Sequence, residues 1–235
     1  MGLFRKETNL EKGLILLYFL MGLIELATEF FADSYIQYVI KALITLSLLV
    51  LYWHSSTRRN SLFFINMVLL LIGRLYFISK EADMLFYALV AVFFYRITEI
   101  YYITKLIKIK DYIPSVLASI PFLFFFLYLV SIPEIILISS YVVLIVQIVL
   151  ISVLSGILLS HYLSNFNRKD IWLLVFGLMS LMQTFLIFIE KFYLSGFTVI
   201  RIRPINLLLN TIVCFSFYKF VIATERLNED RFSNS

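Results

Sequence analysis

The sequence predicts an all-α, polytopic integral membrane protein with eight transmembrane helices and both termini in the cytoplasm. Of its 235 residues, 62% are hydrophobic and 15% are charged, and the mean hydropathy is +0.95. Soluble domains are nearer 45–50% apolar and about 25% charged. A soluble enzyme, a nucleic-acid-binding domain and a disordered tail are excluded, because the surplus apolar side chains would lie on an aqueous surface.

The apolar residues gather in eight segments, each close to the roughly 20 residues that a helix needs to cross a bilayer core of about 30 Å. Backbone groups in lipid must be satisfied within the segment, which makes these segments helices. They also lack the alternating pattern of a membrane barrel. The predicted spans are 13–31, 35–53, 61–78, 82–103, 112–131, 134–163, 171–189 and 204–222.

The first span follows a basic N-terminal stretch, and short loops separate the spans that come after it. The sixth span is long, so we expect it to tilt or to extend past the membrane surface. The whole chain forms a single transmembrane domain, and we expect the polar residues 225–235 to form a mobile tail.

The distribution of lysine and arginine predicts the orientation. With the N-terminus in the cytoplasm, the cytoplasmic side carries 13 of the 20 basic residues, with Lys219 at the cytoplasmic end of the last span among them. The outer side carries 4, and the other three lie deeper within spans. The loop 190–203 is the exception, because it holds Lys191, Arg201 and Arg203 on the outer side. We interpret it as a solvated loop, with an outer partner or lipid headgroups as the alternative ligands of its basic residues.

Other sequence features indicate packing more than chemistry. Ser152, Gly156 and Ser160 repeat every four residues on the sixth span, a stripe of small residues that allows close helix approach. No GxSxG, Walker or dinucleotide-binding motif is present. We expect no metal site and no cofactor, because the two histidines lie far apart and Cys214 is the single cysteine.

The informative residues are the ionisable and amide side chains within the spans. Each charge costs about 2.5–3.5 kcal/mol at a helix centre, so such residues usually face the bundle interior, pair and mark a site. At 1.5 Å per residue, several of them fall in one layer of the outer half. The candidates that we draw from this class are Glu25, Glu29, Lys41, Arg74, Arg96, Glu99, Gln147, Gln183, Asn206 and Asn210.

Two interpretations of these charges stay open. In the first, Glu25 or Glu29 pairs with Lys41 or Arg74, and Arg96 pairs with Glu99, only to hold the helices in register. In the second, the outer-half layer lines a polar cavity in which two close carboxylates share a proton and do acid–base work.

The order of elements resembles that of the YhhN-like lysoplasmalogenase family of eight-helix membrane proteins. The family has Lys-Pro early in its second span, where this chain has Lys41-Ala42, and Gly-Asp late in its third, where this chain has Gly73-Arg74. Its fourth span leads to His and then Tyr, at the positions of Arg96 and Glu99 here. Its seventh begins Gly-Ala and runs to Ser-Asp, and this chain keeps Gly177 with Gln183-Thr184 nearby.

The resemblance covers most of the chain in topology and implies cleavage of the vinyl-ether bond of lysoplasmalogens. This chain has arginine at the family's Asp and His positions, and an arginine stays protonated and cannot act as a general acid at neutral pH. We therefore expect the inherited chemistry to be altered or lost. Glu25, Glu29 and Glu99 are the catalytic candidates that remain. The candidate headgroup contacts are Lys41, Arg74, Arg96, Gln147, Gln183 and Asn210.

Three functions follow as hypotheses. The first is a YhhN-like protein that binds or processes a lysophospholipid-like or lysoplasmalogen-like lipid in an intramembrane pocket. The second is a non-catalytic subunit or scaffold of a larger envelope complex, and the third is a small transporter. The expected partners are membrane lipids and a protein of such a complex, with no nucleic acid. The expected location is the bacterial cytoplasmic membrane.

Overall fold

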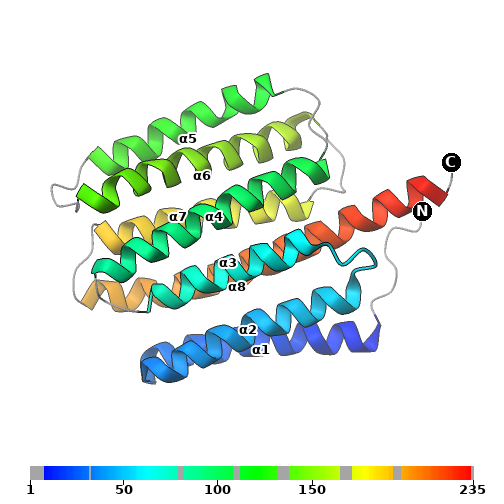
Figure 1. The fold of residues 1–235 in the computed structure, drawn as a ribbon, viewed down its shortest axis with the longest axis horizontal. Helices are drawn as coiled ribbons and strands as arrows, with labels where there is room; N and C mark the ends of the chain where they lie inside the picture. The colour runs from blue at the N-terminus through cyan, green and yellow to red at the C-terminus, as the bar shows by residue number, and fades with distance from the viewer. Residues whose placement is uncertain are drawn as a thin grey trace.

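A computed structural model describes residues 8–31, 33–78, 82–107, 112–131, 138–164, 171–192 and 197–233, and in these residues every regular element is a helix (Figure 1). The beginning of the predicted sixth span, 134–137, lies outside the described residues. The eight helices are α1 (Asn9–Phe31), α2 (Ser34–Ser55), α3 (Ser61–Tyr76), α4 (Ala82–Ile107), α5 (Ile113–Ser131), α6 (Ile138–Ser164), α7 (Ile171–Phe192) and α8 (Phe197–Ser233).

Local side-chain bonds explain where two of the helices begin. At the start of α1, the Thr8 hydroxyl accepts from the Glu11 amide at 3.2 Å, and the Glu11 carboxylate accepts from the Thr8 amide at 3.0 Å. This reciprocal capping box satisfies amides that have no partner within the helix. At the start of α3, the Asn60 side chain accepts from the Leu62 amide at 3.0 Å.

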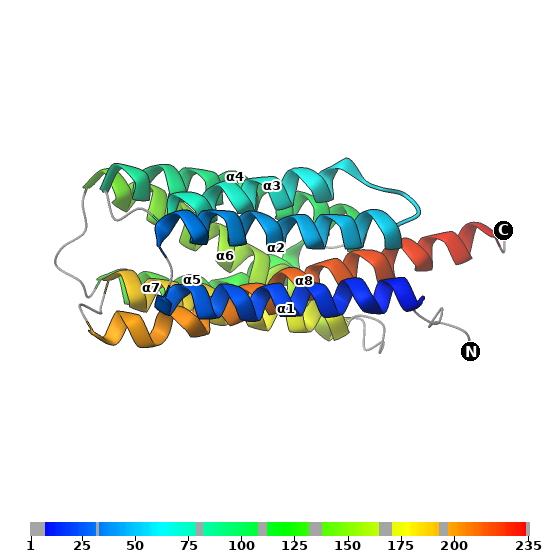
Figure 2. The ribbon, with the colours of Figure 1, turned by 90° about the horizontal axis from the view of Figure 1, so that it is seen from below.

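The helices lie side by side, and α8 lies at the centre of the bundle. Figure 2 shows α2, α3 and α4 in one row and α1, α8 and α7 in the other. In the apolar 18-residue stretch of α8, 67% of the residues are buried inside the bundle, against 17% in the corresponding stretches of α1 and α5. Aromatic side chains of α8 fill the core, where Phe217 stacks on Phe63 and Phe215 stacks on Tyr18. The beginning of α1 and the end of α8 lie at the same end of the molecule (Figure 1).

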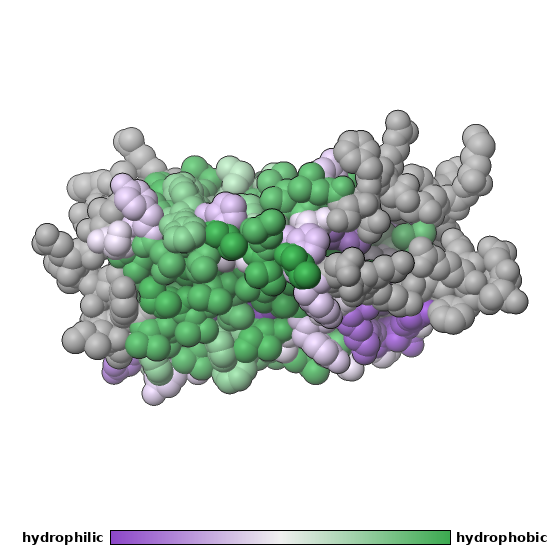
Figure 3. Space-filling view, turned by 90° about the horizontal axis from the view of Figure 1, so that it is seen from above, coloured by the Kyte–Doolittle hydropathy of each residue, from purple (hydrophilic) through white to green (hydrophobic). Residues whose placement is uncertain are grey.

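Seven of the helices described are long and apolar enough to cross a membrane, and α3 is shorter at 16 residues. At 1.5 Å per residue α3 is about 24 Å long, which is less than the hydrocarbon core. Large apolar side chains are exposed around the bundle, and Figure 3 shows a broad apolar surface over its middle. An aqueous surface would not carry so large an apolar area, so the chain is an integral membrane protein.

The C-terminal end of α8 differs from the sequence prediction. The predicted span ends at 222 and a polar tail begins at 225, but α8 continues to Ser233. Glu225 is only 3% exposed, and it accepts from the Tyr52 hydroxyl at 2.8 Å and from the Ser56 hydroxyl at 2.6 Å. The first polar residue of the tail therefore anchors α8 to the end of α2. Residues 234 and 235 lie outside the described part, and the mobility of the tail stays a prediction.

The small-residue stripe on α6 lies where α5 approaches closely, as the sequence analysis predicts. Ser152 and Ser160 are buried, and a Cβ added at Gly156 would come 2.5 Å from the Ser115 carbonyl oxygen and 2.7 Å from the Ser119 amide nitrogen. Both of these atoms belong to the backbone of α5, which cannot rotate away as a side chain can. Gly156 thus sets the distance between α5 and α6.

We expect Gly156→Ala to separate α5 from α6 and to lower the free energy of unfolding by about 1–3 kcal/mol, the usual cost of overpacking. The measurement is the midpoint of thermal unfolding in a mild detergent. Gly13→Ala is the matched control, because a Cβ at Gly13 meets nothing within 4 Å. The control should keep or raise the midpoint, since alanine favours a helix by up to about 1 kcal/mol over glycine. Equal midpoints for the two variants would contradict this account of the α5–α6 contact.

Candidate functional site

A buried carboxylate on α1 binds two cations from neighbouring helices. The Lys41 ammonium on α2 donates to Glu25 Oε1 at 2.8 Å. Nη2 of Arg74 on α3 lies 2.6 Å from Oε1 and 2.7 Å from Oε2 of the same carboxylate. Glu25 is 2% exposed. The pairing that the sequence analysis considers for Glu25 is confirmed, and it joins three consecutive helices.

This first cluster has an excess of positive charge. Two cations face one carboxylate, and unpaired charge is costly at membrane depth. Glu25 takes one of the three Nζ protons of Lys41 and contacts only Nη2 of Arg74. Further N–H groups on both cations therefore remain for another acceptor.

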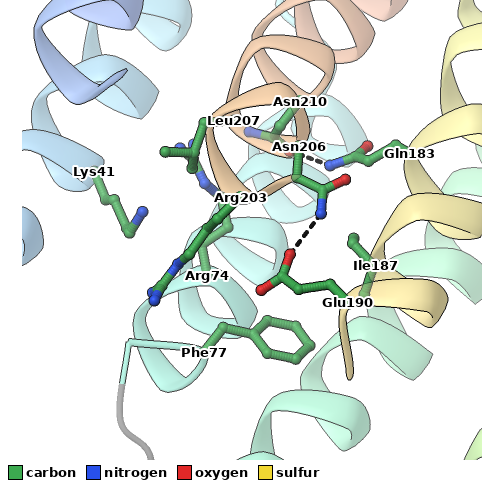
Figure 4. Close-up of a pocket in the computed structure, with 10 residues that line it drawn as sticks. All are labelled: Lys41, Arg74, Phe77, Gln183, Ile187, Glu190, Arg203, Asn206, Leu207 and Asn210. Atoms are coloured by element: carbon green, nitrogen blue, oxygen red, sulfur yellow. Dashed lines mark hydrogen bonds between the residues drawn. The ribbon is translucent and has the colours of Figure 1, made fainter. Parts of the chain in front are cut away.

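A cavity of about 100 Å³ lies beside this cluster and is partly open to the surface of the protein (Figure 4). A water molecule needs about 10–15 Å³ by this kind of measure, so the cavity has room for several waters or for one small polar group. It is smaller than the roughly 300–1,000 Å³ of a pocket that encloses a whole drug-sized ligand. The residues that line it are Lys41, Arg74, Phe77, Gln183, Ile187, Glu190, Arg203, Asn206, Leu207 and Asn210.

One face of α8 supplies more of the polar residues of the cavity than any other helix does. Arg203, Asn206, Leu207 and Asn210 follow the three- and four-residue spacing that brings side chains to the same side of a helix. Opposite them, α7 supplies Gln183, Ile187 and Glu190, and Figure 4 shows the side chains of the two helices facing each other.

Hydrogen bonds between α7 and α8 hold the amides of the cavity in place. Asn206 Nδ2 donates to Glu190 Oε2 at 2.6 Å, and Gln183 Nε2 donates to Asn210 Oδ1 at 3.1 Å (Figure 4). The other end of each asparagine, Asn206 Oδ1 and Asn210 Nδ2, is buried and has no hydrogen-bond partner among the described residues. These two atoms are shielded from the cavity as well as from solvent.

An ion pair beside the cavity links the first helix to the last. Nε of Arg203 lies 2.8 Å from Glu29 Oε1, and the two side chains are 28% and 10% exposed. Glu29 and Glu25 are four residues apart on α1, so they lie on the same face of the helix. Glu25 and Glu29 therefore bind, between them, all three cations that line the cavity.

A second buried cluster joins α4 to α7. Nη1 of Arg96 lies 2.7 Å from Glu99 Oε2 and 3.0 Å from the Ser180 hydroxyl, and Nη2 lies 3.3 Å from the Thr184 hydroxyl. The Tyr95 hydroxyl donates to the other oxygen of Glu99. The predicted pairing of Arg96 with Glu99 is confirmed, and the cluster engages both carboxylate oxygens.

The structure divides the candidate residues into two groups. Lys41, Arg74, Gln183 and Asn210 line the cavity, and Glu25 and Glu29 lie directly behind its cations. Arg96, Glu99 and Gln147 lie elsewhere. Gln147 on α6 donates to the Leu89 carbonyl of α4 at 2.8 Å.

Two charged residues of the cavity, Glu190 and Arg203, are not among the site candidates from the sequence, where both fall in a predicted outer loop and lipid headgroups are one alternative for Arg203. In the structure, Glu190 is 8% exposed within α7 and Arg203 lies within α8. The spacing of Arg203 relative to Asn206 and Asn210 on one helical face is a signal that could have indicated it. The other basic residues of that loop, Lys191 and Arg201, have side chains outside the described part of the structure.

The excess of cations around Glu25 makes a testable difference between two variants. We expect Glu25→Gln to lower the free energy of unfolding by about 3–5 kcal/mol, because it leaves two buried cations without their carboxylate. Lys41→Met should cost less, because Glu25 and Arg74 stay paired one to one. Cys214 is buried and is the single cysteine, so a thiol-reactive dye in a mild detergent reports thermal unfolding. If Lys41→Met lowered the free energy of unfolding as much as Glu25→Gln or more, the claim that two cations share one carboxylate here would be contradicted.

Comparisons with protein-family models, with curated proteins and with solved structures find no match to this chain. The chemistry of the cavity follows from its lining. Three cations and three amides, with one carboxylate, suit a small anionic or hydroxylated group within a membrane bundle. The adjoining Phe77, Ile187 and Leu207 suit the first carbons of an apolar chain.

Proposed function

We propose that the protein binds a lysophospholipid-like or lysoplasmalogen-like lipid and holds the phosphorylated headgroup in the cavity between α2, α3, α7 and α8. The observation that carries this proposal is the meeting of Lys41, Arg74 and Arg203 at one cavity within a membrane-embedded bundle. Arginine and lysine are the side chains that bind phosphate oxygens in proteins, and their bonds to such oxygens are about twice as strong as neutral ones.

We also propose that the chain is a YhhN-like protein that crosses the membrane eight times. In this topology α3, which is followed by a turn at Phe77 and Ile78, is a short span. An even number of crossings fits the placement of the beginning of α1 and the end of α8 at the same end of the bundle. The excess of basic residues on that side favours the cytoplasm for both termini, in a bacterial cytoplasmic membrane.

A C-terminal fusion tests this orientation. Green fluorescent protein attached after Ser235 should fluoresce in bacterial cells, because it folds in the cytoplasm, and alkaline phosphatase at the same position should be inactive. An active phosphatase fusion with a dark fluorescent fusion would place the C-terminus outside and would overturn the proposed topology.

Lipid binding is tested on the protein purified in a mild detergent, with 1-palmitoyl lysophosphatidylethanolamine and its vinyl-ether analogue as probes. Native mass spectrometry should detect one bound lipid. Arg203→Gln should weaken binding about tenfold or more, since a hydrogen bond to a charged group is worth about 1.5–3 kcal/mol.

Arg226→Gln is the matched control, because Arg226 also lies on α8, is 33% exposed and pairs with a single carboxylate, Glu11, at 3.6 Å. It should leave lipid binding unchanged. Inorganic phosphate at millimolar concentration distinguishes a lipid-headgroup site from a site for free phosphate. At a free-phosphate site, inorganic phosphate would bind without lipid and would displace the lipid. Absence of any bound lipid, or equal losses in the two arginine variants, would overturn the headgroup proposal.

Hydrolysis is a separate arm of the same experiment. The carboxylates of Glu25 and Glu29 do not line the cavity, and Glu190 is the carboxylate among the described residues that does. If the vinyl-ether lipid is cleaved, free aldehyde accumulates and Glu190→Gln should abolish its release. Binding without aldehyde release supports a lipid-binding protein that has lost the enzymatic step.

A second candidate function is that of a non-catalytic subunit or scaffold in an envelope complex. Both charge clusters satisfy their carboxylates within the bundle, as a purely structural role requires. Purification from the native membrane in a gentle detergent tests this function. A stoichiometric partner would favour the scaffold, whereas a protein that purifies alone with bound lipid excludes it.

A further inference from the structure

An arginine in the turn between α2 and α3 lies over the ring of an exposed tryptophan. Cζ of Arg59 is 4.3 Å from the centre of the Trp53 ring, and Trp53, near the end of α2, is 52% exposed. Phe64 of α3 packs edge-to-face against the same indole, with ring centres 5.8 Å apart. Trp53, Arg59 and Phe64 thus form one patch, the Arg59 patch, where α2 meets α3.

Hydrogen bonds to the bundle fix the turn that carries Arg59. The Arg59 amide donates to the Ser56 hydroxyl at 2.9 Å, and the Asn60 amide donates to the Tyr52 hydroxyl at 3.0 Å. Both hydroxyls donate in turn to the buried carboxylate of Glu225 on α8. The core of the protein therefore sets the position of Arg59 at the surface.

The backbone of Arg59 is strained. Its φ is 45°, in the left-handed region that residues other than glycine rarely adopt, and it is the one such residue in the described part of the chain. A glycine would adopt this backbone without strain, so the turn itself does not require an arginine side chain. Strained residues gather at binding sites, and here the strained residue is the one whose guanidinium lies over Trp53.

The guanidinium of Arg59 keeps its hydrogen-bond donors free. It carries five N–H groups, and among the described residues none of them meets an acceptor or a carboxylate. Stacking on an aromatic ring uses the face of the guanidinium and leaves its N–H edge for a ligand. That planar edge matches two oxygens of a phosphate group. The Arg59 patch therefore offers a positive charge with unused donors.

The Arg59 patch lies at the boundary of the membrane. The bond between Tyr52 and Glu225 places the end of α2 beside the C-terminal part of α8 (Figure 1), which is the cytoplasmic end in the proposed topology. Tryptophan concentrates where the hydrocarbon core meets the headgroups, and the cytoplasmic leaflet carries the anionic lipids that attract basic residues. We propose that the Arg59 patch is a peripheral site for the phosphate of an anionic phospholipid.

This site is independent of the proposed function. It shares no residue with the cavity, and it lies at the other end of α8, near Glu225 rather than near Arg203. A free phosphate ion offers the same oxygens to Arg59. The exposed indole favours a lipid, because a ring with an apolar body and a polar N–H suits the glycerol and the first acyl carbons beside a headgroup.

Native mass spectrometry on the full chain in a mild detergent tests this site, with dioleoyl phosphatidylglycerol and dioleoyl phosphatidylcholine as competing probes. The unmodified protein should retain the anionic lipid in preference. Arg59→Gln should lower the affinity for phosphatidylglycerol about fivefold or more, the contribution expected of one basic residue at an anionic membrane surface. Trp53→Leu keeps every charge and should also weaken binding, because the guanidinium loses the ring that orients it.

Arg58→Gln is the matched control. Arg58 is exposed in the same turn and carries the same charge, but no ring of the described residues lies under it. It should lower the affinity less than Arg59→Gln does. Arg59→Gly separates binding from folding, because glycine suits the left-handed backbone. It should bind as weakly as Arg59→Gln, with a thermal midpoint that stays the same or rises.

Three results would overturn the site. Equal losses in Arg58→Gln and Arg59→Gln would mean that a diffuse surface charge attracts the lipid. Unchanged binding in Trp53→Leu would show that the stacked arrangement does not matter. Displacement of phosphatidylglycerol by millimolar inorganic phosphate would assign the donors of Arg59 to a free ion instead of a lipid.

Discussion

The carboxylate of Glu25 is the interaction on which the rest of the structure depends. It lies on α1, is almost fully buried, and binds Lys41 from α2 and Arg74 from α3. A cation at membrane depth is tolerated only where an acceptor faces it, so the positions of α2 and α3 relative to α1 follow from this one group. Arg74 and Lys41 then have a fixed place from which their remaining donors can reach the cavity.

The arrangement of charge around the cavity is asymmetric, although its total is balanced. Glu25, Glu29 and Glu190 match Lys41, Arg74 and Arg203 in number among the described residues of this region. Glu25 and Glu29 lie behind the cations, however, and Glu190 shares the lining with them. The interior of the cavity is therefore more positive than the layer as a whole. Such an arrangement stabilises the bundle without a ligand and still attracts an anionic group.

Much of the fold follows from the sequence, because the length and hydropathy of a span are local properties. The same holds for the pairs Glu25–Lys41 and Arg96–Glu99, since an intramembrane charge must find a partner at its own depth. A polar cavity is one of the two interpretations that the sequence allows, but its full lining could not be predicted in this way. Glu190 and Arg203 look like residues of a polar loop, and only the packing of α7 on α8 shows that Glu190 is buried and that Arg203 reaches Glu29 on α1. Glu225 is similar, because its partners Tyr52 and Ser56 lie far away in the chain.

The pairing of Glu29 with Arg203 has a consequence for biogenesis. Glu29 leaves the ribosome on the first helix, whereas Arg203 arrives with the last one, and synthesis proceeds at roughly 5–20 residues per second. The carboxylate therefore enters the membrane on the order of ten seconds or more before its partner exists, and during that time it lacks the cation that binds it in the finished bundle. Glu25 gains a cationic partner sooner, because Lys41 follows on the next helix. Substitutions at Arg203 thus act on the last step of membrane insertion as well as on the finished bundle, and the yield of inserted protein depends on the final helix.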